Sequence, residues 1–237
     1  MLEPIELLNG ILSIIFVAIS IMVGIRILIR YFEHKQRTFL LVGLTWIGLV
    51  SIWYASSLSV ILILLTGYGI NDHLYMLIGN GLLPITSFIW MIAFTDLMYK
   101  DKQLVILVLF GIYNALFEIF FLYFLVVDMS FLGEVTGPVD ATYGWFVTFY
   151  QFSMLILIII TGTLFSRESI KSDNLEINLK GKLLLIAFYA LVLGAILEIF
   201  SHLSILILIF ARLILIFSSL ACYGGFILPS WLKNLFI

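Results

Sequence analysis

Long apolar stretches separated by short polar segments run along the whole chain. A helix needs about 20 apolar residues to cross the ~30 Å hydrocarbon core of a bilayer. Seven stretches meet that length, and the predicted spans are residues 5–28, 39–66, 73–97, 103–127, 143–166, 181–201 and 204–229. They use up the chain, so the pattern predicts an all-α polytopic membrane protein: one domain, residues 1–237, formed by a bundle of seven transmembrane helices.

The composition agrees with this pattern and excludes several classes of protein. Hydrophobic residues make up 63% of the chain and charged residues 11%, with a mean hydropathy of +1.22, which excludes a water-soluble globule. The net charge of −2 leaves no basic surface for nucleic acid. Cys222 is the single cysteine, which excludes an internal disulfide and a cysteine-based zinc site. The expected surroundings are therefore the lipid bilayer.

Lysine and arginine are confined to alternate connections between the spans. With the exception of Arg212, they lie at or beside the connections between spans 1 and 2, 3 and 4, and 5 and 6, and at the C-terminal end: Arg26, Arg30, Lys35, Arg37, Lys100, Lys102, Arg167, Lys171, Lys180, Lys182 and Lys233. The opposite connections and the N-terminal end carry acidic residues instead. Because positively charged loops stay in the cytoplasm, we expect the N-terminus outside and the C-terminus inside a prokaryotic-type plasma membrane.

Two segments complete the expected topology. Residues 1–6 are acidic where a signal peptide needs positive charge, so we expect the first span to be retained. Residues 128–144 contain Gly133, Gly137 and Pro138 and are predicted to form a turn-rich loop over the outer face.

Three charged residues lie within the predicted spans away from the inner ends and the N-terminal end, where each costs roughly 2.5–3.5 kcal/mol at a helix centre. They are Glu118, Glu198 and Arg212. Counted from the span ends, Glu118 and Arg212 lie about 15 Å below the outer surface and Glu198 about 6 Å below it. Side chains lean toward the helix N-terminus, which directs the glutamates inward and Arg212 outward. We therefore expect the three charged groups to converge in the outer half of the bundle.

Neutral polar residues occur at matching depth. Asn114 lies one helical turn from Glu118, and Asn80 and Gln151 lie about 12 Å below the outer ends of their spans. Pro84 is expected to kink the third span nearby. The sequence thus predicts one polar region in the outer half, to which five helices contribute.

Two interpretations of this region remain open. Arg212 and one glutamate could form a structural ion pair that fixes helix packing. Alternatively, the guanidinium neutralises only one of the two carboxyls. The second carboxyl is then protonated, or its charge is compensated by a cation or a small polar ligand that enters from outside. Glu198 and His202 have metal-ligand spacing but lack a third ligand, so we expect no metal, and no catalytic residue or cofactor is assigned.

Seven spans with an external N-terminus resemble the topology of rhodopsins, G-protein-coupled receptors and sugar carriers, but their motifs are missing. The last span holds no lysine for a retinal Schiff base. Through the order of its basic loops and its ending, Gly225-Phe-Ile-Leu-Pro229-Ser-Trp231, the chain is similar to small uncharacterised seven-helix prokaryotic membrane proteins. It is also distantly similar to the seven-helix sensor regions of histidine kinases. That resemblance implies a sensor and, since an output domain is lacking, a separate cytoplasmic partner.

The sequence therefore favours a sensor or receptor-like protein with an outer-half pocket around Glu118, Glu198 and Arg212. One alternative is a proton- or cation-coupled transporter or channel that uses the same residues. A second is a lipid isomerase or cyclase with an intramembrane glutamate as its acid. Other enzyme classes are disfavoured, because the inner loops lack the clustered aspartates that bind Mg²⁺.

Overall fold

The computed structural model describes residues 2–237, and helices dominate it. The elements in chain order are α1 (Pro4–His34), α2 (Arg37–Leu49), η1 (Val50–Trp53), α3 (Tyr54–Thr66), α4 (Asp72–Asn80), α5 (Leu83–Met98), η2 (Lys100–Lys102), α6 (Gln103–Val127), η3 (Met129–Phe131), β1 (Gly133–Gly137), β2 (Asp140–Tyr143), α7 (Trp145–Ile170), α8 (Leu175–Ile199), η4 (Ser201–Leu203), α9 (Ile205–Ile227) and α10 (Ser230–Phe236). Here η marks a short 3₁₀ helix.

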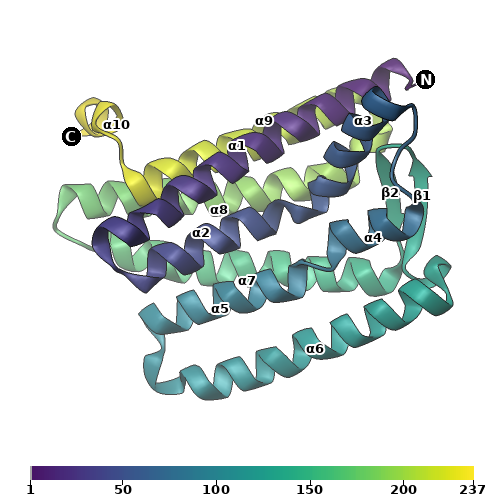
Figure 1. The fold of residues 1–237 in the computed structure, drawn as a ribbon. Helices are drawn as coiled ribbons and strands as arrows, with labels where there is room; N and C mark the ends of the chain where they lie inside the picture. Colours follow the sequence, from purple (N-terminus) through teal and green to yellow (C-terminus); the bar gives the residue numbers. More distant parts are fainter. Residues whose placement is uncertain (1) are drawn as a thin grey trace.

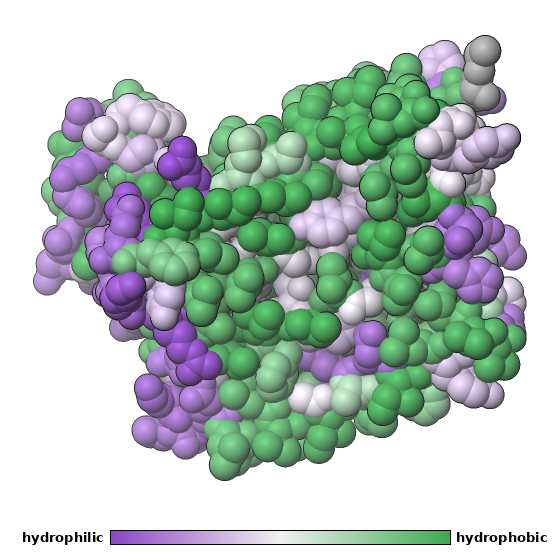
Figure 2. Space-filling view, viewed as in Figure 1, coloured by the Kyte–Doolittle hydropathy of each residue, from purple (hydrophilic) through white to green (hydrophobic). Residues whose placement is uncertain are grey.

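Seven helical segments of residues 2–237 are long and apolar enough to cross a membrane, the number that the sequence predicts. They are α1, α2 with α3, α4 with α5, α6, α7, α8 and α9. The helices α1 and α8 run several residues beyond the predicted spans. Figure 2 shows hydrophilic residues gathered at the two ends of the molecule and a broad hydrophobic surface between them. This distribution indicates a multi-pass membrane protein.

Neighbouring helices pack in a ring. Backbone contacts join α7 to α8, α8 to α9, α9 to α1, α1 to α2, α2 to α5, and α5 to α6. Figure 1 shows α1 and α9 along one side of the bundle and α6 along the opposite side. The ring closes between α6 and α7 through aromatic side chains, because Phe117 stacks on Tyr150 with ring centroids 3.6 Å apart and on Phe146 at 5.1 Å.

The two ends of the bundle differ in chemistry, and we name them by their content. The hairpin end carries β1, β2, η4 and the N-terminal start of α1 (Figure 1). The basic end carries the polar connections between α1 and α2, α5 and α6, and α7 and α8, together with α10. There Arg37 lies 3.7 Å from Asp96, and Lys233 of α10 pairs with Glu176 of α8.

Two of the seven spans are interrupted. The third breaks between α4 and α5 at Gly81 and Leu82, just before Pro84, which confirms the predicted kink. The second breaks at η1, and the sequence did not predict this interruption. At that break the Tyr54 hydroxyl donates to the carbonyl of Ile47 at 2.5 Å. Both breaks lie beside the main pocket of the bundle.

The segment predicted as an irregular loop over residues 128–144 instead contains a short β-hairpin. Strands β1 and β2 pair antiparallel, with Glu134 opposite Thr142. The hairpin is held to the helices because the hydroxyl of Ser59 in α3 donates to the carbonyl of Pro138 at 2.5 Å. Of the three residues expected in turns, Pro138 lies in the turn of the hairpin, whereas Gly133 and Gly137 belong to β1. The strands were missed because a bulge between Val135 and Gly137 obscures their alternation.

The helices α1 and α2 cross in direct backbone contact at Gly24 and Gly43. A Cβ atom on Gly43 would lie 2.8 Å from the Gly24 carbonyl oxygen and 2.9 Å from the Leu28 nitrogen. Since backbone atoms cannot move aside, we expect Gly43→Ala to lower the free energy of unfolding by about 1–2 kcal/mol. Reversible unfolding in mixed detergent micelles measures this loss.

The control for this prediction is Gly79→Ala in α4. A Cβ atom there would lie 3.4 Å from the Tyr143 hydroxyl, which is ordinary van der Waals contact. We expect that variant to be neutral or slightly stabilised, because alanine favours the helix. Equal losses in the two variants would contradict the close crossing.

Candidate functional site

A buried polar cluster joins three helices in the half of the bundle near the hairpin end. Nη2 of Arg212 in α9 lies 2.9 Å from Oε1 of Glu198 in α8. The same nitrogen donates to Oδ1 of Asn9 in α1 at 2.7 Å. The side chain of Arg212 is 2% exposed and that of Glu198 is 22% exposed. The predicted association of Glu198 with Arg212 is therefore present, and Asn9 completes it.

This cluster leaves hydrogen-bonding capacity unused. Within residues 2–237, Nε and Nη1 of Arg212 and Oε2 of Glu198 are buried and have no partner. The guanidinium carbon of Arg212 lies 6.0 Å from the ring centroid of Trp53. Buried polar groups are almost always hydrogen-bonded in folded proteins, so two donor atoms and one acceptor without partners at one place are unusual.

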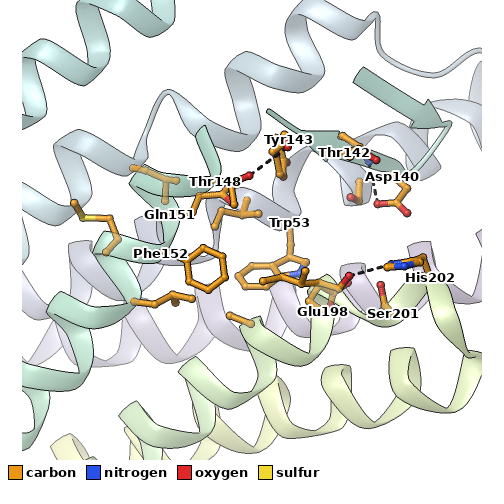
Figure 3. A pocket seen from close by; sticks show the side chains of 18 of the residues that line it. Trp53, Asp140, Thr142, Tyr143, Thr148, Gln151, Phe152, Glu198, Ser201 and His202 are labelled. Carbon is orange, nitrogen blue, oxygen red and sulfur yellow. Dashed lines mark hydrogen bonds between the residues drawn. The ribbon is translucent and has the colours of Figure 1, made fainter. Parts of the chain in front are cut away.

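A pocket of about 670 Å³ adjoins this cluster, and Asn9, Glu198 and Arg212 are among the residues that line it. Its walls come from η1, α7, α8 and the hairpin. Figure 3 shows the rings of Trp53 and Phe152 at its centre, between hairpin residues and the end of α8. Its volume lies within the ~300–1,000 Å³ typical of sites for small organic ligands.

The hairpin contributes polar groups to the pocket wall at Asp140 and Tyr143. Loss of hydration raises the pKa of the Asp140 carboxyl, although the Ala141 amide donates to it at 2.9 Å and the charges of Arg212 and His202 act in the opposite direction. Burial raises the pKa of Tyr143 to about 12. Tyr143 therefore stays neutral at physiological pH.

Two of the predicted neutral residues lie at the α4–α7 side of this pocket. The side-chain amide of Gln151, which lines the pocket, donates to Oδ1 of Asn80 at 2.9 Å. Asn80 is fully buried and donates to the carbonyl of Met76 at 3.2 Å. Asn80 thus fixes the orientation of Gln151, and Gln151 is the one that presents a polar atom to the pocket.

Asn114 belongs to a separate polar cluster between α5, α6 and α7. Its Oδ1 accepts from the Tyr150 hydroxyl at 2.8 Å and from the Ser87 hydroxyl at 3.3 Å, and its amide donates to the carbonyl of Pro84 at 3.1 Å. Asn114 is absent from the pocket lining. The structure therefore gives it a packing role at the kink before α5.

The predicted convergence of three charges is wrong for Glu118. This residue lies on α6, on the opposite side of the bundle from α9 and Arg212 (Figure 1), and it does not line the pocket. Depth alone had suggested the contact, but the ring places α6 between α5 and α7. Asp140 of the hairpin, and not Glu118, is the second carboxyl near the Arg212–Glu198 pair.

A double-mutant cycle tests this correction. We expect the coupling energy between Glu118→Gln and Arg212→Met to be within about 0.5 kcal/mol of zero, because groups without shared partners contribute additively to stability. The coupling between Glu198→Gln and Arg212→Met should exceed about 1 kcal/mol, since these side chains are in contact. Both cycles are measured as free energies of unfolding, and a large Glu118 coupling would restore the original expectation.

Asn9, Trp53 and Asp140 were not predicted from the sequence. A signal for Asn9 existed, because Asn9, Ser13 and Ser20 are polar residues on one face of an otherwise apolar span; Ser20 also bonds Ser219 of α9 at 2.8 Å. Trp53 and Asp140 carried no such signal. Their positions depend on the helix break at η1 and on the hairpin register.

In residues 2–237, no three His, Cys, Asp or Glu side chains gather as metal ligands would. His202, paired with Glu198 by spacing, donates from Nδ1 to the carbonyl of Ile199 at 3.0 Å. Comparisons with protein families, with characterised proteins and with solved structures find no match for this chain.

Proposed function

We propose that this protein is a receptor-like membrane protein that binds a small ligand in the pocket beside Arg212 and Glu198. The observation that carries the proposal is the position of the unused donor and acceptor atoms of this pair at a pocket of about 670 Å³. A purely structural ion pair gains stability when its remaining hydrogen bonds are satisfied. In this pair Nε and Nη1 of Arg212 and Oε2 of Glu198 have no partner within residues 2–237, which supports a role beyond packing.

The proposed orientation places the hairpin end outside the cell. Lysine and arginine lie at the basic end, and the loops of the hairpin end carry acidic residues such as Asp72, Asp128 and Glu134. The positive-inside rule then assigns the basic end to the cytoplasm of a plasma membrane. The ligand would reach the pocket from the outer side, and a separate cytoplasmic protein would read the response at the basic end.

The closed inner side of the pocket supports a receptor over a carrier. Toward the basic end the lining stops at Ile158 and Leu191, which are both buried. Beyond them lies an apolar core that includes Trp90, Phe94 and Phe188. A carrier must open its site to both sides of the membrane, and this core separates the pocket from the basic end.

A thermal-shift screen with matched variants tests ligand binding. Ala195 of α8 lines the pocket, and Leu193, two residues before it, is exposed on the surface of the same helix. We expect ligands that raise the Tm of the wild type to lose this effect in Ala195→Phe, which fills the pocket, and to keep it in Leu193→Phe. Stabilisation that persists in Ala195→Phe would show that the ligands bind elsewhere.

Proton and cation flux in liposomes separates the receptor from a transporter. We expect no flux through the wild type above that of protein-free vesicles, because the apolar core blocks the inner side. Flux that is lost in Glu198→Gln would contradict the receptor and establish a proton- or cation-coupled transporter. Glu118→Gln serves as the control, since this carboxyl lies away from the pocket.

A further inference from the structure

The walls of the pocket are mostly apolar, Gln151 contributes a neutral amide at the α4–α7 side, and the charged groups lie near the hairpin end. Ile52, Leu83, Met154 and Leu155 contribute to its walls from three different elements. The charged and free polar atoms belong to Arg212, Glu198 and Asp140, near the hairpin end. Such a lining fits a molecule with a long apolar part and one compact polar group, because the apolar part then contacts apolar side chains and the polar group contacts the charged ones.

Residues that line the pocket from α7 and α8 point to an opening between these two helices. Phe152 of α7 and Ile199 of α8 line it and are at the same time 40% and 45% exposed. Near the basic end these helices are in tight contact, since a Cβ atom on Gly162 would lie 2.6 Å from the Phe188 ring. Toward the hairpin end the pocket lies between them. In a bilayer this opening faces lipid, which is the route for an apolar molecule.

The polar end selects the kind of head group. Arg212 and Glu198 neutralise each other and leave free donors and a free acceptor. Asp140 adds a second carboxyl to the wall. A carboxylate head would be repelled by the two carboxyls of Glu198 and Asp140, and an ammonium head would be repelled by the buried guanidinium of Arg212. A neutral hydroxyl accepts from Arg212, donates to Glu198 and brings no charge into the site.

We propose that the ligand is a hydrophobic alcohol, a long apolar chain with a neutral hydroxyl head, that enters from the lipid between α7 and α8 and places its hydroxyl against Arg212 and Glu198. This inference rests on the proposed function, because it identifies the ligand class of the same pocket. With the proposed orientation, the alcohol enters from the outer leaflet.

Photo-crosslinking in lipid nanodiscs tests the head group directly. Three probes share one hexadecyl chain that carries a diazirine and differ in their head, which is an alcohol, a carboxylate or an amine. Peptide mass spectrometry measures labelling of the pocket segments, residues 152–158 and 191–199, relative to the exposed face of α6, which reports contact with bulk lipid. Excess hexadecanol shows which labelling is saturable.

We expect the alcohol probe to label the pocket segments about tenfold more than either charged probe, and hexadecanol to suppress this labelling. The variant Ala195→Phe should lose it, and Leu193→Phe should retain it. Preferential labelling by the carboxylate or the amine probe would contradict an alcohol as the ligand, but it would still support ligand binding in this pocket. If no probe labelled the pocket above the α6 background, in a protein that also gave no ligand-induced Tm shift, the proposed function would fall as well.

Discussion

Arg212→Met is expected to lower the free energy of unfolding by about 3–5 kcal/mol, the largest loss that we expect from a single substitution at either polar cluster. Methionine fills a similar volume but leaves the Glu198 carboxyl buried without its cation and Asn9 without its donor. Removing one partner of a buried pair strands the other charge, which costs more than the pair contributes. Unfolding in mixed micelles measures the loss.

Two further variants test the physical reason for this effect. We expect the double variant Arg212→Met with Glu198→Leu to recover most of the loss, because neither charge then remains buried alone. Arg167→Met, at an exposed arginine of the basic end, should change stability by less than about 0.5 kcal/mol. A double variant as unstable as the single one would show that Arg212 stabilises through its packing and not through its charge.

The second largest effect is expected for Asn114→Leu, at about 2–3 kcal/mol. Asn114 makes three hydrogen bonds, to Tyr150, Ser87 and the carbonyl of Pro84. Hydrogen bonds between membrane helices contribute roughly 0.6–1.7 kcal/mol each, and leucine replaces none of them. The loss should appear in the free energy of unfolding, whereas ligand binding by the folded variant should remain unchanged because Asn114 does not line the pocket.

Tyr150→Phe provides the matched comparison, since it removes one of these bonds and keeps the ring that stacks on Phe117. We expect a loss of about 1 kcal/mol or less, and a smaller additional effect of Asn114→Leu in that background. An Asn114→Leu variant that folds normally but no longer binds ligand would place Asn114 in the binding site after all.

The seven spans and the pairing of Glu198 with Arg212 could be predicted because they depend on local properties. Span length follows from the thickness of a bilayer, and the pairing follows from depth along two consecutive helices, α8 and α9, joined by a short turn. Consecutive helices with a short connection are neighbours, and the lean of both side chains toward the N-terminus of their helix reduces the difference in depth between Glu198 and Arg212. The kink at Pro84 could also be predicted, because a proline interrupts a helix at its own position.

Depth was not sufficient for Glu118, since its position depends on the order of helices around the ring. That order is set by contacts such as Gly24 with Gly43 and Phe117 with Tyr150, which link different helices through the shapes of their surfaces. Asp140 was missed for a related reason, because it reaches the pocket only when the hairpin folds back over the helices. Apolar side chains specify such contacts through their shapes, and a hydropathy pattern does not record the shape of a side chain.

The closure of the ring by α9 against α1 has a consequence for synthesis of the chain. Asn9 enters the membrane first, Glu198 much later and Arg212 with the last span, so the polar cluster assembles only when translation is almost complete. Until then Asn9 and Glu198 have no cation between them, and the pocket lacks one of its walls. A chain that stops before α9 therefore exposes unpaired polar groups to lipid, a state that membrane quality control can distinguish from the finished protein.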